Sequence, residues 1–299
     1  MSIKVSVVIP CFNGDKYLKY TIESVLNQTR TVNEIIVVDD GSSDSTKQIA
    51  TSFPDVIYLY HENKGVSFSR NRGFRESIGE YVVFLDADDL LPRNRIEDDC
   101  RFLDKHSDIG YVFGWFDVID QNGDIKDRTH GENIVDAGYH TILEGKATVP
   151  PGAVTFRSKN LRQLNDVFDV NVRAAEDFDL YLRFSRLFPI YCLNHTALLY
   201  RRHQNNFSSY NGGIDTLKSM LLRLDAQEEY VTKHAHLLRS LRDGRSHWKE
   251  LLGPRCVGQL VMAFKAKEWK IGYRVFIFLV KYCPYIFMKS IFQRVLKRL

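Results

Sequence analysis

Several familiar signatures are missing from this sequence of 299 residues. No G-x-G-x-x-G follows the first apolar segment and no G-x-x-x-x-G-K-[ST] occurs, which excludes the dinucleotide-binding fingerprint and the P-loop. The five cysteines are odd in number, widely spaced and form no C-x-x-C pair. They argue against a disulfide framework or a zinc site and favour a reducing compartment. The longest apolar stretch, 275–288, is broken by Lys281 and Pro284, so no standard membrane-spanning helix is predicted.

Acidic residues are nearly absent from the last part of the chain. Nine of the 41 basic residues but one of the 37 acidic residues lie in 265–299, so this segment carries +8 and the remainder −4. The negative remainder disfavours a nucleic-acid partner. Segment 268–299 interleaves aromatic and aliphatic residues with Lys and Arg, which is typical of amphipathic helices at an anionic membrane surface. We expect peripheral membrane contact there; a helical lid packed on the core, or a dimer contact, is the alternative.

The first third of the chain alternates short apolar segments with amphipathic ones. Segments 3–9, 34–38, 56–60 and 81–85 are β-branched and nearly continuous in apolar character, which predicts strands buried on both faces of a parallel sheet. Helices are expected over 15–28, after a cap at Asp44, and over 65–77. Strand and helix in alternation predict an α/β fold with a doubly wound, mostly parallel sheet.

Beyond residue 108 the pattern changes. A hairpin is expected around Asn122-Gly123, with its first strand over 109–119. A further strand is predicted over 153–156 and a helix over 176–188. Residues past about 213 read as helical without alternating strands. We therefore expect a domain over 1–212 and a helical, basic extension over 213–299.

Polar residues follow three of the predicted strands: Asn13 after the first, Asp40 after the second, and Asp86-Ala87-Asp88-Asp89 after the fourth. Ligands of such sheets bind beyond the carboxyl ends of the strands. Asp40-Gly41 has the simpler interpretation of a turn with a helix cap. Three carboxylates within four residues repel one another unless a cation is present, which indicates a divalent metal.

These segments together resemble a known family. VSVVIPCFNGDKYLKYTIESVLNQT, EIIVVDDGSSDST, NKGVSFSRNRG and GEYVVFLDADDLLP occur in that order over residues 3–100, followed by AEDFDL from Ala175 and YRRH ending at His203. This series resembles the inverting glycosyltransferases of family 2. The resemblance implies the GT-A fold and transfer of a sugar from a nucleotide-sugar, a UDP-sugar being favoured, to an acceptor hydroxyl.

The resemblance also implies residue roles. Those expected to bind the nucleotide are Pro10, Phe12, Asn13, Asp40, Arg70 and Asp86. Asp88 would bind Mg²⁺ or Mn²⁺, and His203 would bind the metal or hydrogen-bond the departing diphosphate. Asp177 is the expected catalytic base, with Glu176 as the alternative.

Simpler interpretations remain for some of these residues. Arg70 and Arg72 could be solvated charges on a helix face. The acids at 176–179 could serve only to stabilise a helix N-terminus.

The acceptor is expected to be a surface polysaccharide or a lipid-linked saccharide, and the protein to be cytoplasmic at the inner face of the plasma membrane. Two other functions stay open at this point. A sugar-1-phosphate nucleotidyltransferase would also use an α/β sheet and a metal-bound diphosphate, but it would release pyrophosphate. A catalytically silent nucleotide-sugar-binding protein would have no need of the Asp86–Asp88 and Glu176–Asp177 pairs.

Overall fold

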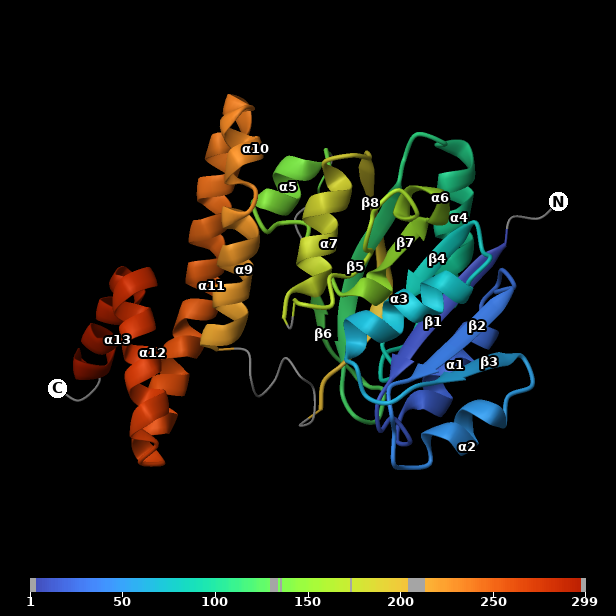
Figure 1. Cartoon of the computed structure of the whole chain (residues 1–299), viewed down its shortest axis with the longest axis horizontal. Helices are drawn as coiled ribbons and strands as arrows, with labels where there is room; N and C mark the ends of the chain where they lie inside the picture. Colours follow the sequence, from blue (N-terminus) through green and yellow to red (C-terminus); the bar gives the residue numbers. More distant parts are fainter. Residues whose placement is uncertain (1–3, 130–133, 135, 173, 204–212, 297–299) are drawn as a thin grey trace. The chain divides into compact units, whose positions relative to one another are not determined.

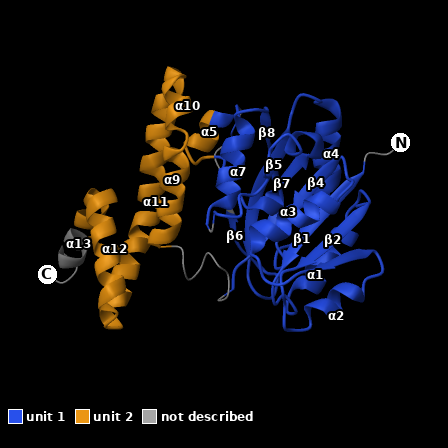
Figure 2. Ribbon diagram, in the orientation of Figure 1, with its two compact units in different colours: residues 1–139, 147–203 blue, residues 140–146, 204–299 orange. Residues whose placement is uncertain are grey.

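The computed structural model describes residues 4–129, 134, 136–172, 174–203 and 213–296, with side chains up to residue 290. The chain divides into two compact units (Figure 2). The first comprises residues 1–139 and 147–203, and the second comprises 140–146 and 204–299. The domain boundary expected at 212/213 falls at the edge of 204–212, outside the described residues.

The first unit is built on one mixed sheet (Figure 1). Its strands run in the spatial order β3-β2-β1-β4-β7-β5-β6, with β8 pairing β5. The strand bounds are β1 Val5–Cys11, β2 Glu34–Asp39, β3 Val56–Tyr60, β4 Tyr81–Phe84, β5 Tyr111–Ile119, β6 Ile125–Thr129, β7 Val154–Arg157 and β8 Ile190–Arg201. Strands β1 to β4 are parallel, β7 is antiparallel to β4 and β5, and β8 is parallel to β5. The structure confirms the predicted α/β fold with its mostly parallel sheet.

The apolar strands form the core as their composition predicts, with one exception. Strands β1 and β4 are buried along their full length. Strand β3 is not buried on both faces, because it lies at the edge of the sheet and has a neighbour on one side only. Ile57 and Tyr60 are exposed there. The prediction of a fully buried strand was wrong for β3.

Helices of the first unit connect these strands. Their bounds are α1 Leu18–Leu26, α2 Thr46–Thr51, α3 Val66–Glu76, α4 Arg95–Lys105, the 3₁₀ turn η1 Pro151–Ala153, α6 Ser158–Leu161 and α7 Glu176–Ser185. Helix α3 lies close to β1 and β2: a Cβ at Gly73 would come within 2.3 Å of Val8 Cγ1. A larger residue at this position would push α3, and the side chains it carries, away from the sheet.

Two of the expected helix starts shift. Helix α1 begins at Leu18 rather than at residue 15, after a turn in which Leu18 N donates to Gly14 O. Helix α2 has Ser45 at its N-cap. Asp44 lies one residue earlier, where its Oδ1 accepts from Thr46 N at 2.9 Å. In both places the residues in front of the helix contribute to loops at the end of β1 and β2.

Every secondary-structure element in the described residues of the second unit is a helix or a 3₁₀ turn. Its elements are α5 Tyr139–Leu143 (the first residue of which belongs to the first unit), α9 Ile214–Asp225, α10 Glu228–Thr232, the 3₁₀ turn η2 Ala235–Leu237, α11 Leu238–Lys265, α12 Trp269–Tyr282 and α13 Pro284–Leu296. Among the described residues no single helix has the length and hydropathy to cross a bilayer. The pair Trp269–Tyr282 and Pro284–Ser290 passes that criterion together but is bent by 116°.

Candidate functional site

The candidate site lies where the order of the strands reverses. The chain builds β1, β2 and β3 toward one edge and then places β4 on the other side of β1. In sheets of this kind the crevice beyond the carboxyl ends of the strands at the switch point binds ligands. Asn13, Asp40 and Asp86 follow the parallel strands β1, β2 and β4, so the sheet brings these three predicted residues to the same edge.

The loops after β1 and β2 are joined by hydrogen bonds. Asn13 N donates to Ser42 Oγ at 2.8 Å, and Asn13 Oδ1 accepts from Ser43 N at 2.9 Å. Asn13 has a positive φ of 51°, a conformation that asparagine tolerates better than most residues. Phe12 beside it is 55% exposed, whereas Pro10 is buried within β1. Phe12 and Asn13 therefore present groups to solvent at this edge, and Pro10 shapes the strand beneath them.

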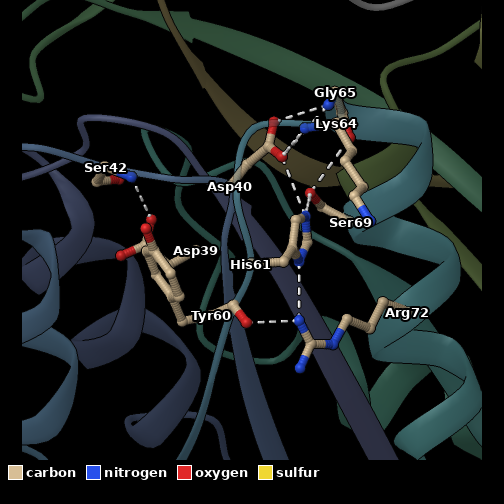
Figure 3. Close-up of polar contacts among 9 residues, drawn as sticks. All are labelled: Asp39, Asp40, Ser42, Tyr60, His61, Lys64, Gly65, Ser69 and Arg72. Carbon is tan, nitrogen blue, oxygen red and sulfur yellow. Dashed lines mark hydrogen bonds and ion pairs between the residues drawn. The ribbon is translucent and has the colours of Figure 1, made fainter.

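Asp40 binds the loop in front of α3 (Figure 3). Its Oδ1 accepts from Lys64 N at 2.7 Å and its Oδ2 accepts from Gly65 N at 2.9 Å. Asp40 Oδ1 also lies 3.0 Å from His61 Nε2. Asp40 is 5% exposed. The carboxylate is thus held in a fixed position by the 61–65 loop, and of its two oxygens Oδ2 carries fewer of these contacts.

His61 is a buried link between Asp40 and α3. Arg72 Nη1 lies 3.0 Å from His61 Nδ1 and donates to it, because a guanidinium has only donors. Nδ1 must then carry the lone pair, which places the proton on Nε2, facing Asp40. Burial lowers the pKa of His61, and the nearby Arg72 charge adds to that effect, while Asp40 opposes it. The network therefore holds a neutral imidazole that donates to Asp40. Composition and motif spacing gave no signal for this residue.

Arg70 is the centre of a second cluster. Its Nη2 donates to Asp86 Oδ1 at 2.7 Å and its Nη1 to Glu176 Oε1 at 2.9 Å. The Arg70 side chain is 3% exposed and its guanidinium lies over the ring of Phe168. The interpretation of Arg70 as a solvated charge was wrong. Arg70 joins α3 to the end of β4, 16 residues away at Asp86, and to the start of α7, 106 residues away at Glu176.

Asp177 lies beside this cluster at the N-terminus of α7. Burial, followed by the adjacent Glu176 carboxylate, raises the pKa of Asp177 to about 7, and the Phe178 N–H and Arg70 oppose that rise. The preceding residue, Ala175, has a φ of 64°, which costs of order 1 kcal/mol or more for a residue with a Cβ. A carboxyl with a pKa near neutrality, held at a strained turn, is suited to proton transfer.

Asp88 and His203 form the third cluster. His203 Nε2 lies 2.9 Å from Asp88 Oδ2, and the His203 ring lies against Tyr17. Burial and then the Asp86 charge raise the pKa of Asp88, whereas His203 opposes that rise. Within the described ranges no group of three or more His, Cys, Asp or Glu side chains is arranged to hold a metal ion. The pair brings one carboxylate and one imidazole side by side.

Asp89 and Arg201 hold the Asp88–His203 pair together. Asp89 Oδ1 accepts from Arg201 N at 2.8 Å, and Arg201 Nε donates to the Asp88 carbonyl at 2.8 Å. Arg201 Nη1 donates to the carbonyl of Asp120, and Arg201 is 3% exposed. These bonds fix the end of β8 against the loop after β4. The side chain of Arg201 therefore donates to backbone carbonyls, whereas the neighbouring Arg202 is exposed to solvent.

The structure thus groups most of the predicted site residues. Arg70, Asp86 and Glu176 are in contact, as are Asp88 and His203. Asp40 is bound to the loop that leads into α3, the helix carrying Arg70. His61, Tyr17 and the Asp89–Arg201 contact were not predicted, because each depends on segments that meet only in the folded chain.

Comparison with known proteins assigns the family. The family model described as glycosyl transferase family 2 matches residues 6–167. A glycosyltransferase of Rickettsia typhi that is named as uncharacterized is 33% identical over 210 residues, covering 66% of this chain and 63% of its own length. TuaG of Bacillus subtilis, a glycosyltransferase named for teichuronic acid biosynthesis, is 29% identical, with 69% and 81% covered. Chondroitin synthase of Escherichia coli is 29% identical, with 75% of this chain but 31% of that protein covered.

Solved structures agree with the fold. Residues 1–349 of Staphylococcus aureus TarS in complex with UDP superimpose with a TM-score of 0.63 at 21% identity, covering 81% of this chain and 70% of that one. The complex of the same protein with UDP-GlcNAc gives a TM-score of 0.61 at 19% identity, with 91% and 90% covered. At this identity the likeness concerns the fold, which is that of a GT-A enzyme. With the family model matching more than half of its length, the chain belongs to glycosyl transferase family 2.

Proposed function

We propose that this protein is an inverting glycosyltransferase that moves a sugar from a UDP-sugar to an acceptor hydroxyl. The observation that carries the proposal is the Arg70 cluster: a buried guanidinium bound to Asp86 and Glu176, with the raised-pKa carboxyl of Asp177 beside it. This cluster lies at the sheet edge where nucleotides bind in doubly wound folds. Its residues belong to segments that carry the resemblance to family 2.

The loops after β1 and β2 are proposed to hold the uracil base. Phe12 is exposed and offers a face for stacking, and Asn13 is fixed by its bonds to Ser42 and Ser43. Asp40 Oδ2 accepts from Gly65 N, and a carboxylate oxygen has room for a second donor such as uracil N3–H. The bound UDP and UDP-GlcNAc of the TarS structures are consistent with this choice of nucleotide.

The donor set at Asp88 and His203 fits a divalent cation that is completed by substrate. Mg²⁺ is usually held by one or two carboxylates together with phosphate oxygens, and Mn²⁺ also accepts imidazole. Asp86 and Asp89 lie within three residues of Asp88, so a cation there would offset the repulsion among their carboxylates. We propose that Asp88 and His203 hold Mg²⁺ or Mn²⁺, which neutralises charge on the departing diphosphate when bound.

Asp177 is proposed to act as the base. The acceptor oxygen forms a bond to the anomeric carbon from the face opposite the phosphate, and the bond from that carbon to the phosphate oxygen breaks. UDP leaves with the electron pair, and the acceptor proton passes to an oxygen of Asp177. Because attack and departure occur on opposite faces, the configuration at the anomeric carbon inverts. Arg70 favours the ionised form of Asp177, since its charge opposes the rise in the pKa of that carboxyl.

The names of two relatives support the expected class of acceptor. TuaG is named for teichuronic acid biosynthesis and the Escherichia coli relative is a chondroitin synthase. We therefore propose a growing polysaccharide or a lipid-linked saccharide as acceptor. The chain spans 63% of the rickettsial relative's length.

Binding of UDP tests the donor site. In a thermal-shift screen with UDP, GDP and dTDP, we expect UDP with Mn²⁺ to raise the melting temperature most, and EDTA to reduce the shift. Binding at 100 times Kd adds about 2.7 kcal/mol to the free energy of unfolding, which is readily measured in this assay. The absence of a shift with any of the three nucleotides would contradict the proposal.

Substitution of His61, followed by titration with UDP, tests the role of Asp40 specifically. His61→Leu removes the donor to Asp40 and leaves the carboxylate less well fixed, so we expect about a tenfold weaker Kd for UDP. His61→Gln should recover part of the affinity, because its amide can donate to Asp40. Arg75→Gln, an exposed position on α3, is the matched control and should bind UDP as the wild type does. If all variants bound UDP with equal affinity, Asp40 would not contribute to binding of the uracil.

A further inference from the structure

Helix α12 carries an exposed face that no described element covers in full. Trp269, Tyr273, Phe276, Ile277 and Val280 recur at intervals of three or four residues, so they share one side of the helix. Each is at least 38% exposed, with Tyr273 at 68%. The opposite side packs inside the second unit through Gly272, Val275, Phe278 and Leu279. We call the exposed residues the apolar stripe.

A basic stripe runs beside the apolar one. Lys270, Arg274 and Lys281 lie at i, i+4 and i+11, positions that follow one line along an α-helix next to the apolar stripe. All three are exposed. Arg274 forms an ion pair with Asp215 of α9. The lysines are not in ion pairs with described acidic side chains, although Lys281 Nζ lies over the ring of Tyr282.

Helix α13 extends the same chemistry. It follows α12 after a sharp bend of 116°, and Phe287 contacts Phe276 across that bend. Tyr285 is 75% exposed and Met288 63% exposed, and Lys289 is exposed as well. The two helices together thus present aromatic and aliphatic side chains bordered by ammonium groups.

The apolar stripe and the exposed lysines beside it together favour an anionic membrane surface as partner. An apolar protein interface would be served by the apolar stripe alone, whereas exposed lysines at its border match anionic headgroups. Trp and Tyr are the residues that favour the boundary between headgroups and acyl chains. We propose that α12 and the described part of α13 form a docking surface for an anionic lipid bilayer. The helices would lie in the plane of the interface, with the apolar stripe among the acyl chains.

Tryptophan fluorescence makes the proposal directly testable. Of the three tryptophans, Trp115 and Trp248 are buried and Trp269 is 64% exposed. Adding vesicles of phosphatidylcholine with about one third phosphatidylglycerol should shift the emission of the full-length protein to the blue and carry it into the vesicle pellet. Pure phosphatidylcholine vesicles should do so far less, and Trp269→Phe should abolish the blue shift while leaving the protein in the pellet.

Two double variants separate the contributions. Tyr273→Ser with Ile277→Ser, and separately Lys270→Glu with Lys281→Glu, should each lower the partition into anionic vesicles by more than about tenfold. Ile78→Ser with Leu187→Ser is the control, because it removes two exposed apolar side chains from the first unit. It should leave partition unchanged. Circular dichroism and UDP binding confirm that each variant is folded.

Three results would overturn the proposal. The first is absence of binding to anionic vesicles, and the second is equal partition of the α12 variants and the wild type. The third is loss of a dimer, seen by light scattering, in the α12 variants with no change in vesicle binding; the face would then be a contact between copies. None of these results bears on sugar transfer, so failure here leaves the proposed function standing.

Discussion

Replacing Asp177 with asparagine should lower kcat by about 10² to 10⁴, the range over which a positioned general base contributes. Asparagine keeps the shape of the side chain and its Oδ1 can still accept from Phe178 N, as the carboxylate does at 2.7 Å. Kd for UDP should change little, because Asp177 is not among the groups proposed to hold the nucleotide. Initial rates and UDP titrations on the same protein sample measure the two quantities separately.

The pH dependence gives this prediction a second readout. Because the pKa of Asp177 is raised to about 7, wild-type kcat should rise with pH up to about 7 and then level off. A carboxyl whose folded pKa exceeds its unfolded value makes the fold less stable as pH rises between the two values. Asp177→Asn should therefore melt at least as high as the wild type at pH 8, despite its loss of activity.

Glu176 is the matched comparison. It lies one residue away and is bound to Arg70 at 2.9 Å, so Glu176→Gln should weaken that contact and yet keep a pH-dependent rate. Full turnover by Asp177→Asn, together with loss of the pH dependence in Glu176→Gln, would assign the base to Glu176 instead.

Replacing Arg70 with methionine should have the largest effect on stability. The change leaves the carboxylates of Asp86 and Glu176, in a partly buried site, without the cation that both contact. Removing one partner of a buried ion pair typically costs about 3–5 kcal/mol, and chemical denaturation would measure that loss. The pKa of Asp177 should rise further, since Arg70 lowers it. Any remaining activity should thus require a higher pH.

Two other substitutions control for this effect. Arg70→Lys keeps the charge, but one ammonium cannot reproduce the fork of bonds to two carboxylates, so an intermediate stability is expected. Arg75→Met alters an exposed arginine on the same helix and should change the free energy of unfolding by less than about 0.5 kcal/mol. A loss at Arg70 no greater than that at Arg75 would mean that the cluster does not stabilise the fold.

The sequence was most informative where a local pattern determines structure. Apolar segments of strand length, joined by helices, predicted β1, β2 and β4 and the edge at which Asn13, Asp40 and Asp86 meet. The direction of parallel strands made that convergence a consequence of topology. Strand β3 was predicted as a strand but not as an edge strand, because the order of strands in the sheet cannot be read from their apolar character.

Local sequence patterns did not predict the contacts between segments that are distant in the chain. The sequence around Arg70 does not predict its ion pair with Glu176, because that contact forms only when the start of α7 packs against α3. His61 carries no spacing signal, and its tautomer depends on Arg72 from the next helix. The Asp89–Arg201 bond joins residues 112 positions apart. Each of these is a polar group whose burial is possible only because its partner is supplied by another part of the fold.

The stereochemistry of sugar release tests the central claim most directly. When no acceptor is present, water can take the place of the acceptor hydroxyl, and proton NMR of the anomeric signal identifies the released sugar as it forms. With an α-linked UDP-sugar and Mn²⁺, we predict that UDP and the β anomer appear first, before mutarotation, and that Asp177→Asn suppresses both. Initial release of the α anomer, or of UMP and a sugar 1-phosphate in place of UDP and free sugar, would contradict the account.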